Sequence, residues 1–235
     1  MTVEGTSTDP APGEPLTIDQ SAAGRPAGAM SGTDRHDGRS GLRRVCVFCG
    51  SARSDRPAYT EAARALGQEL VERGIGVVYG GGRVGLMGEL ADAAMRAGGE
   101  VIGVIPRRLS DLEVGHGAIT ELRIVKSMHE RKGMMADLSD AFVALPGAAG
   151  TLEELFEAWT WGMLGLHAKP TLLLDVDDFW QPLLIQLRRM VDDGYLDGRR
   201  LDALGVVTDA AELLSFVDGY EHPARKWTAP PPPAA

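Results

Sequence analysis

The residues best suited to chemistry lie between Leu145 and Glu154, in the sequence LPGAAGTLEE. An apolar run over 141–145 stops at Pro146, small residues follow, and a helical pattern begins at Thr151. A strand, a turn and a helix in this order present backbone N–H groups and a helix N-terminus to an anion. Thr151 and Glu154 also satisfy the capping box S/T-x-x-E, which explains both residues without any chemistry. The helix cap and the anion site are therefore open alternatives.

Two cations follow a second capping sequence. Ser127-Met128-His129-Glu130 predicts a helix capped by Ser127, with Arg131 and Lys132 in or near its first turn. The helix macrodipole disfavours cations there by a few tenths to about 1 kcal/mol each, which indicates an anion or a carboxylate nearby. Two solvated surface cations are the alternative. His129 is interpreted as a packing or hydrogen-bonding residue rather than a base.

A glycine loop, Gly80-Gly81-Gly82-Arg83-Val84-Gly85, matches G-x-G-x-x-G between a predicted strand and a predicted helix. A dinucleotide site also needs an acidic residue at the end of the next strand. Glu100 begins that strand, and the strand ends at Pro106-Arg107-Arg108 instead. The loop therefore favours a cradle for a single phosphate over NAD. Glycines that allow close helix–strand packing are the alternative.

The net charge of −9 argues against a protein built to hold nucleic acid, although a local cationic pocket can still bind a small anion. No apolar run approaches the roughly 20 residues of a membrane helix, and the N-terminus has no secretory apolar core. We expect a cytoplasmic enzyme or binding protein with no membrane partner.

The two cysteines, Cys46 and Cys49, form C-x-x-C inside a predicted strand. Their odd separation puts the side chains on opposite faces of that strand, which argues against thiol catalysis. Two cysteines alone do not make a structural zinc site, and no other spacing indicates a metal.

Apolar runs and helical patterns alternate along the chain. Strands are predicted at 43–48, 76–79, 100–105, 119–125, 141–145, 171–174 and, weakly, 206–207; helices at 57–73, 128 onward, 151–164, 179–191 and 210–217, with one more ending near 97. This order predicts one α/β domain over 43–220, Rossmann-like and doubly wound, with a mainly parallel sheet. Residues 1–42 are predicted to be a disordered tail and 221–235 a Pro-rich tail.

Ligands of such sheets bind beyond the carboxyl ends of the strands. That rule selects four segments, Gly50-Ser51, Gly80 to Gly88, Ser127 to Lys132 and Pro146 to Glu154. In the helix that follows the last of them, Trp159, Trp161 and Met163 are predicted to be core or dimer-forming residues.

Three of these segments together resemble the LONELY GUY (LOG) family of cytokinin riboside 5′-monophosphate phosphoribohydrolases, over about 43–217. The family motifs GGGxxGLMG and M-x-x-R-K are matched fully. The third motif, PGGxGTxxE, has Ala148 in place of its second glycine, where a β-carbon could crowd a phosphate or restrain a positive φ. Since alanine is the smallest such change, we expect Ala148 to alter phosphate affinity or turn geometry slightly rather than to abolish binding. Similar sequences have also been labelled lysine decarboxylases, but nothing in the residues independently supports a pyridoxal phosphate lysine.

The resemblance implies hydrolysis of the N-glycosidic bond of AMP or an N6-modified AMP, giving a free base and ribose 5-phosphate. Glu154 would stabilise the oxocarbenium-like state and activate water, and Arg131 would orient Glu154 and the substrate. No cofactor or metal is implied, and a homodimer with the site near its interface is expected. The implied substrate-binding residues are Gly80, Gly81, Gly82, Gly85, Glu113, Arg131, Lys132, Gly147, Ala148, Ala149, Gly150, Thr151, Glu153 and Thr160.

Two other functions remain as alternatives. The first is a nucleotide-binding or sensor protein of the same fold without turnover. The second is an NAD(P)-dependent oxidoreductase that uses the Gly80 loop, for which the sequence offers no hydride-transfer site.

Overall fold

A computed structural model describes residues 41–223 of the 235-residue chain. Apart from residues 41–42 and 221–223, the two predicted tails lie outside the described residues, so both stay predictions. No helix of the described part is long and apolar enough to cross a membrane.

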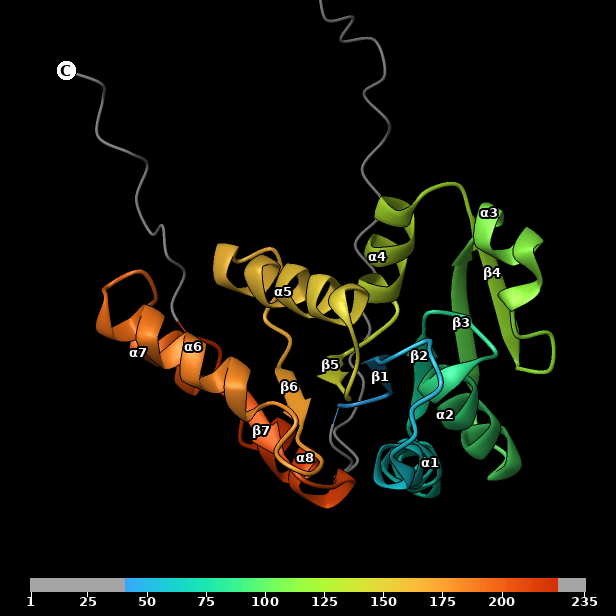
Figure 1. Cartoon of the computed structure of the whole chain (residues 1–235), viewed down its shortest axis with the longest axis horizontal. Coiled ribbons are helices and arrows are strands. Elements are labelled where there is room, and N and C mark those ends of the chain that lie inside the picture. The colour runs from blue at the N-terminus through green and yellow to red at the C-terminus, as the bar shows by residue number, and fades with distance from the viewer. Residues whose placement is uncertain (1–40, 224–235) are drawn as a thin grey trace, which may run out of the picture. The chain divides into compact units, whose positions relative to one another are not determined.

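One parallel sheet organises the described residues (Figure 1). Its strands stand in the order β4-β3-β2-β1-β5-β6-β7, and every neighbouring pair runs parallel. The strands are β1 (Arg44–Phe48), β2 (Gly76–Tyr79), β3 (Val101–Pro106), β4 (Glu121–Val125), β5 (Ala141–Ala144), β6 (Thr171–Leu174) and β7 (Leu204–Val207).

Helices connect the strands, as parallel pairing requires. They are α1 (Pro57–Glu72), α2 (Gly85–Arg96), α3 (Arg107–Leu109), the π-helix η1 (Ser110–Val114), α4 (Met128–Asp137), α5 (Ala149–Leu164), α6 (Gln181–Asp192), α7 (Gly198–Asp202) and α8 (Ala210–Asp218).

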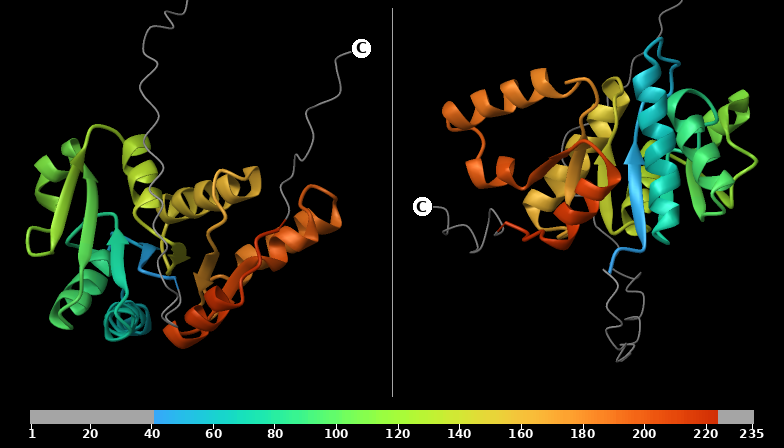
Figure 2. Two further views of the ribbon diagram at one scale, coloured as in Figure 1. Left: turned by 180° about the vertical axis from the view of Figure 1, so that it is seen from behind. Right: turned by 90° about the horizontal axis from the view of Figure 1, so that it is seen from below.

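The helices cover both faces of the sheet. One core lies between the sheet and α1, α2 and α8, and the other between the sheet and α4, α5 and α6. Alternate residues of β1 enter the two cores, Val45 and Val47 on one face and Cys46 and Phe48 on the other. Figure 1 shows α4 and α5 above the strands and α1 and α8 below, and Figure 2 shows the same layers from behind and from below. The predicted doubly wound α/β fold is confirmed.

The strand order reverses at β1. The chain winds outward from β1 to β4, then returns to place β5 on the other side of β1. Connections leave β1 and β5 in opposite directions there, so a crevice opens at their carboxyl ends. Two backbone hydrogen bonds join the loops around it: Gly50 N–H donates to Pro146 O at 3.1 Å, and Leu86 N–H donates to Gly50 O at 3.0 Å.

Several segments differ from the sequence-based prediction. β4 and α6 each begin two residues later than expected, at Glu121 and Gln181, and β7 begins two residues earlier, at Leu204. The helix expected from Thr151 begins at Ala149, two residues earlier. The segment expected to be loose over 106–117 contains α3 and η1, and α7 was not predicted.

Candidate active site

A cavity of about 330 Å³ opens at the carboxyl ends of β1, β2, β3 and β5, at the point where the strand order reverses. Its lining has three parts. We group the lining residues by their chemistry. The polar wall consists of Gly50, Ser51, Ala148, Gly150 and Thr151, and the apolar wall consists of Val84, Met87, Ile105, Leu109 and Val114. The remaining lining residues are Cys49, Gly80, Gly82, Arg131 and Glu154.

A buried ion pair forms the charged centre of this lining. Arg131 Nη1 on α4 lies 3.0 Å from Glu154 Oε1 on α5, and the two side chains are only 7% and 5% exposed. The approach does not meet hydrogen-bond angles, and Oε1 has no hydrogen-bond partner among the described residues. Glu154 therefore has a neighbouring positive charge and a buried carboxylate oxygen without a hydrogen bond.

Two backbone carbonyls hold the Arg131 guanidinium in place. Arg131 Nε donates to Val104 O at 3.0 Å, and Nη2 donates to Gly80 O at 3.2 Å. A β-carbon on Gly80 would lie 1.9 Å from Nη2, so only glycine leaves room for the guanidinium at this position. The planar fork of donors of an arginine suits two fixed acceptors in a way that a lysine ammonium does not.

Burial raises the pKa of Glu154 above its ordinary value, and Arg131 opposes that shift. Desolvation disfavours the charged carboxylate, while an adjacent cation favours it. A carboxylate with a raised pKa in a cleft is a common arrangement for proton transfer near neutral pH.

The N-terminus of α5 forms part of the polar wall, which Gly50 and Ser51 complete. Its N-cap is Ala148, and no side chain caps the helix. The predicted capping box of Thr151 and Glu154 is therefore wrong: the helix has begun before Thr151, and Glu154 lies in its second turn. Backbone N–H groups of the first helical turn have no intrahelical acceptor, which makes this terminus suitable for an anion.

The turn before α5 explains two residues of the motif. A β-carbon on Gly147 would lie 2.1 Å from Thr151 Oγ1, so the glycine lets the buried threonine fold back over the turn. Ala148 has φ −100° and ψ −157°, an extended conformation that alanine adopts freely. The concern that Ala148 restrains a positive φ therefore does not apply, and only its methyl group in the cavity wall remains.

The glycines of the loop over 80–85 serve two different purposes: some line the cavity, and others allow close packing of the backbone. Gly80 and Gly82 line the cavity. Gly81 and Gly85 have φ of +74° and +63°, and a β-carbon on Gly85 would lie 2.5 Å from Ala52 O. Gly85 thus lets the loop after β1 pack on the start of α2, which is the close-packing interpretation of the motif.

Lys132, Ala149 and Thr160 are not among the described residues that line the cavity. Lys132 pairs with Glu153 and Glu157. Thr160 is exposed on α5, and Ala149 is in its first turn without lining the cavity. The backbone of Glu113 belongs to η1, but its side chain is outside what the structure describes. Sequence reasoning missed the apolar wall, because Val84, Met87, Ile105, Leu109 and Val114 carry no signal beyond hydrophobicity.

The predicted placement of the cysteines is confirmed. Cys46 and Cys49 are buried free thiols in the cores on opposite faces of the sheet. Burial raises the pKa of both thiols, so they are protonated at neutral pH. Ser127 accepts a hydrogen bond from Glu130 N and caps α4 as predicted. No group of three or more metal-ligating side chains occurs in the described residues.

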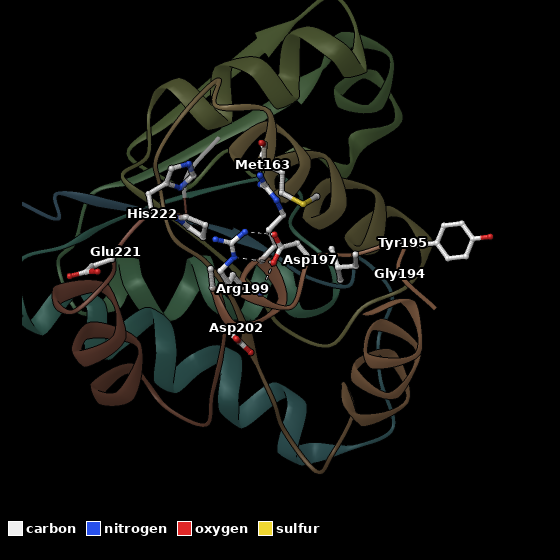
Figure 3. A pocket seen from close by; sticks show the side chains of 12 residues that line it. Met163, Gly194, Tyr195, Asp197, Arg199, Asp202, Glu221 and His222 are labelled. Atoms are coloured by element: carbon white, nitrogen blue, oxygen red, sulfur yellow. Dashed lines mark hydrogen bonds and ion pairs between the residues drawn. The ribbon is translucent and has the colours of Figure 1, made fainter. Parts of the chain in front are cut away.

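A second cavity, of about 780 Å³, shares no lining residue with the first (Figure 3). It is bounded by the end of α5, the α6–α7 connection and residues 221–223. Its Asp197 and Arg199 pair with each other, and Arg200 donates to Met163 O at 3.1 Å. Tyr195 points away from it. These charges bond to the protein itself, so the smaller cavity is the candidate active site.

Comparison with known proteins finds relatives along most of the chain. A family model described as "Possible lysine decarboxylase" matches residues 87–217. A probable cytokinin riboside 5′-monophosphate phosphoribohydrolase of Oryza sativa subsp. japonica is 46% identical, over 92% of this chain and 94% of its own. A cytokinin riboside 5′-monophosphate phosphoribohydrolase of Arabidopsis thaliana is also 46% identical, over 78% of this chain and 84% of its own.

Solved structures of low identity share the fold. A molybdenum cofactor binding protein from Rippkaea orientalis has a TM-score of 0.58 at 20% identity, over 76% of this chain and 98% of that one. The Moco carrier protein from Chlamydomonas reinhardtii has a TM-score of 0.57 at 22% identity, over 75% and 96%. At such identity the likeness concerns the fold alone.

The fold and the site define a class: doubly wound α/β proteins in which a helix N-terminus without a side-chain cap lies at a cavity that also contains a buried arginine–carboxylate pair. Sequence identity of 46% to a curated relative, over more than nine-tenths of the chain, identifies the family within this class. The chain belongs to the LONELY GUY (LOG) family.

Proposed function

We propose that the protein hydrolyses the N-glycosidic bond of AMP or an N6-modified AMP, releasing the free base and ribose 5-phosphate. The observation that carries this proposal is the buried Arg131–Glu154 pair, which lies in a cavity lined by both polar and apolar residues. The activities named for the curated relatives support the same reaction.

The lining suggests how such a substrate lies. The phosphate binds the N-terminus of α5 at Gly150 and Thr151, where unpaired N–H groups favour an anion. The planar base packs against the apolar wall around Met87 and Leu109. Because the charged pair belongs to the same small cavity, this orientation brings the ribose to Glu154.

Glu154 carries the chemistry in this proposal. As the C1′–N bond breaks, positive charge develops on the ribose, and the carboxylate stabilises it. Water then adds at C1′ as Glu154 accepts its proton, and that proton passes to the departing base. Arg131 holds Glu154 in its ionised form at the start. No lysine is among the described residues that line the cavity, so the decarboxylase description of the family model finds no support there.

The test is incubation with AMP and, separately, with adenosine, followed by chromatography of the free base. We expect adenine from AMP and much less from adenosine, which cannot use the phosphate contacts of α5. No adenine from AMP would contradict the proposal, and binding of AMP without hydrolysis would favour the sensor alternative.

A change at Ala148 tests how its methyl group affects the cavity. Ala148→Gly should lower the free energy of unfolding by about 0.4–1 kcal/mol, because glycine gives the unfolded chain more freedom. One methyl group is worth about 0.8 kcal/mol, so the KM for AMP should change by about fourfold or less. Urea unfolding and initial rates measure the two effects. A loss of activity would show that the alanine is essential rather than tolerated.

We also propose a homodimer, which the exposed Leu164 and Leu166 at the end of α5 support as apolar contacts. The cytoplasmic compartment and the lack of a nucleic-acid partner stay predictions.

A further inference from the structure

Lys132 is adjacent to the catalytic pair but does not line the cavity. Its ammonium pairs with Glu153 and lies 2.8 Å from Glu157 Oε2, and its side chain is only 13% exposed. Glu153 and Glu157 are one helical turn apart on α5, so a single cation on α4 reaches both. Each helix thus places one residue at the buried pair and its neighbour at this outer cluster.

We propose that Lys132 is a positioning residue rather than a substrate ligand: it fastens α4 to α5 through Glu153 and Glu157, and its positive charge favours the carboxylate form of Glu154. The proposal deepens the function given above, because it concerns the charge state of the carboxylate assigned to that reaction.

The mechanical part follows from the spacing along both helices. Arg131 and Lys132 are consecutive, as are Glu153 and Glu154, and consecutive residues point about 100° apart. The inner pair, Arg131 and Glu154, and the outer cluster around Lys132 therefore join the same two helices along neighbouring stripes. Two contacts resist rotation of α5 against α4 better than one, which holds Glu154 in register with Arg131.

The electrostatic part follows from every charged or titratable group that acts on Glu154. These groups are Cys46 in β1 and Cys49 directly after it, Arg131 and Lys132 on α4, and Glu153 and Glu157 on α5. The thiols are neutral, so four charges matter. Burial raises the pKa of Glu154; Arg131 and Lys132 lower it, and Glu153 and Glu157 raise it. Without Lys132, Glu153 and Glu157 would still raise the pKa of Glu154, and Arg131 would be the only one of these four charges left to lower it.

The test is the pH profile of kcat/KM for AMP, whose acidic limb reports the base of the free enzyme. Lys132→Met should move the midpoint of this limb upward by about 0.5–1 pH unit, less than the 1–3 units of a direct partner. Lys132→Arg, which keeps the charge, should restore it. Arg64→Met is the matched control: it removes an exposed cation that joins α1 to α2 through Glu89, away from this cluster, and should leave the limb unchanged.

A second variant gives the opposite sign. Glu153 is 52% exposed, so Glu153→Gln should fold, and it removes a negative charge, which should move the limb downward. If the acidic limb had the same midpoint in wild type, Lys132→Met and Glu153→Gln, the proposal would be overturned. A downward shift of this midpoint in Lys132→Met would also overturn it.

Direct titration separates this proposal from the proposed function. The side-chain carboxyl carbon of Glu154, followed by ¹³C NMR against pH, should titrate higher in Lys132→Met than in wild type and lower in Glu153→Gln. This result needs no turnover. If wild type were inactive but the Glu154 titration shifted in both variants as expected, the proposed reaction would be rejected and the role of Lys132 would stand. If wild type were active but the titration did not shift, the role of Lys132 would be rejected and the reaction would stand.

Discussion

Glu154→Gln is expected to lower kcat for AMP hydrolysis by about 10²–10⁴-fold, the usual contribution of a positioned acid–base group. Glutamine has nearly the same shape, so it fills the site and still faces Arg131. It has no negative charge to stabilise the developing oxocarbenium ion and cannot accept a proton from water. Because the phosphate and base contacts are unchanged, KM should move little.

Initial rates of adenine release at saturating AMP measure this loss. Glu89→Gln makes the same carboxylate-to-amide change on α2, where Glu89 pairs with the exposed Arg64, and should retain wild-type kcat. Full activity in Glu154→Gln would remove Glu154 from the mechanism.

Arg131→Met is expected to cost about 3–5 kcal/mol of unfolding free energy, because it leaves the buried Glu154 without its opposite charge. This is a large share of the 5–15 kcal/mol that keeps a typical domain folded. The pKa of Glu154, already raised by burial, loses its main opposing influence and rises further. When the pKa of an acid is higher in the folded state than in the unfolded state, the folded protein is destabilised at pH values above the folded-state pKa. This destabilisation disappears as the pH falls below that pKa. The variant should therefore gain stability as the pH falls towards 5.

Urea unfolding across this pH range measures the effect, and a double variant separates stability from catalysis. Arg131→Met with Glu154→Gln removes both charges, so it should recover most of the lost stability and its pH dependence while staying inactive. If Arg131→Met were as stable as wild type at pH 8, the buried pair would not be a charged pair in solution.

Much of the fold follows from the sequence, because a parallel sheet buried on both faces uses short apolar runs bounded by turn residues. The bounds of β2 (Gly76–Tyr79) and β6 (Thr171–Leu174) agree with the prediction. The start of α5 does not, because the Thr151–Glu154 spacing is also that of a capping box. A helix that begins on small residues without a side-chain cap leaves no such signal. The short α7 and η1 have no periodicity to detect.

The site was partly predictable for the same reason. The rule that parallel strands present their carboxyl ends at one edge predicts from the sequence alone that Ser51, the Gly80 loop, Arg131 and Thr151 lie together. It could not separate neighbours such as Arg131 and Lys132. Which of two adjacent helical residues faces the cavity depends on the rotation of the helix, and tertiary packing sets that rotation. The apolar wall is indistinguishable in sequence from core.

The hydrogen bonds that join Gly50 to Pro146 and Leu86 to Gly50 have a consequence for affinity. They join the loops of β1 and β5 to the first turn of α2 before a ligand arrives. A flexible rim would lose conformational entropy on each binding event, at roughly 1–2 kcal/mol per ordered backbone residue. Here folding has already restricted those residues, so nucleotide binding loses little additional conformational entropy in the loops. More of the free energy of the nucleotide contacts therefore appears as affinity.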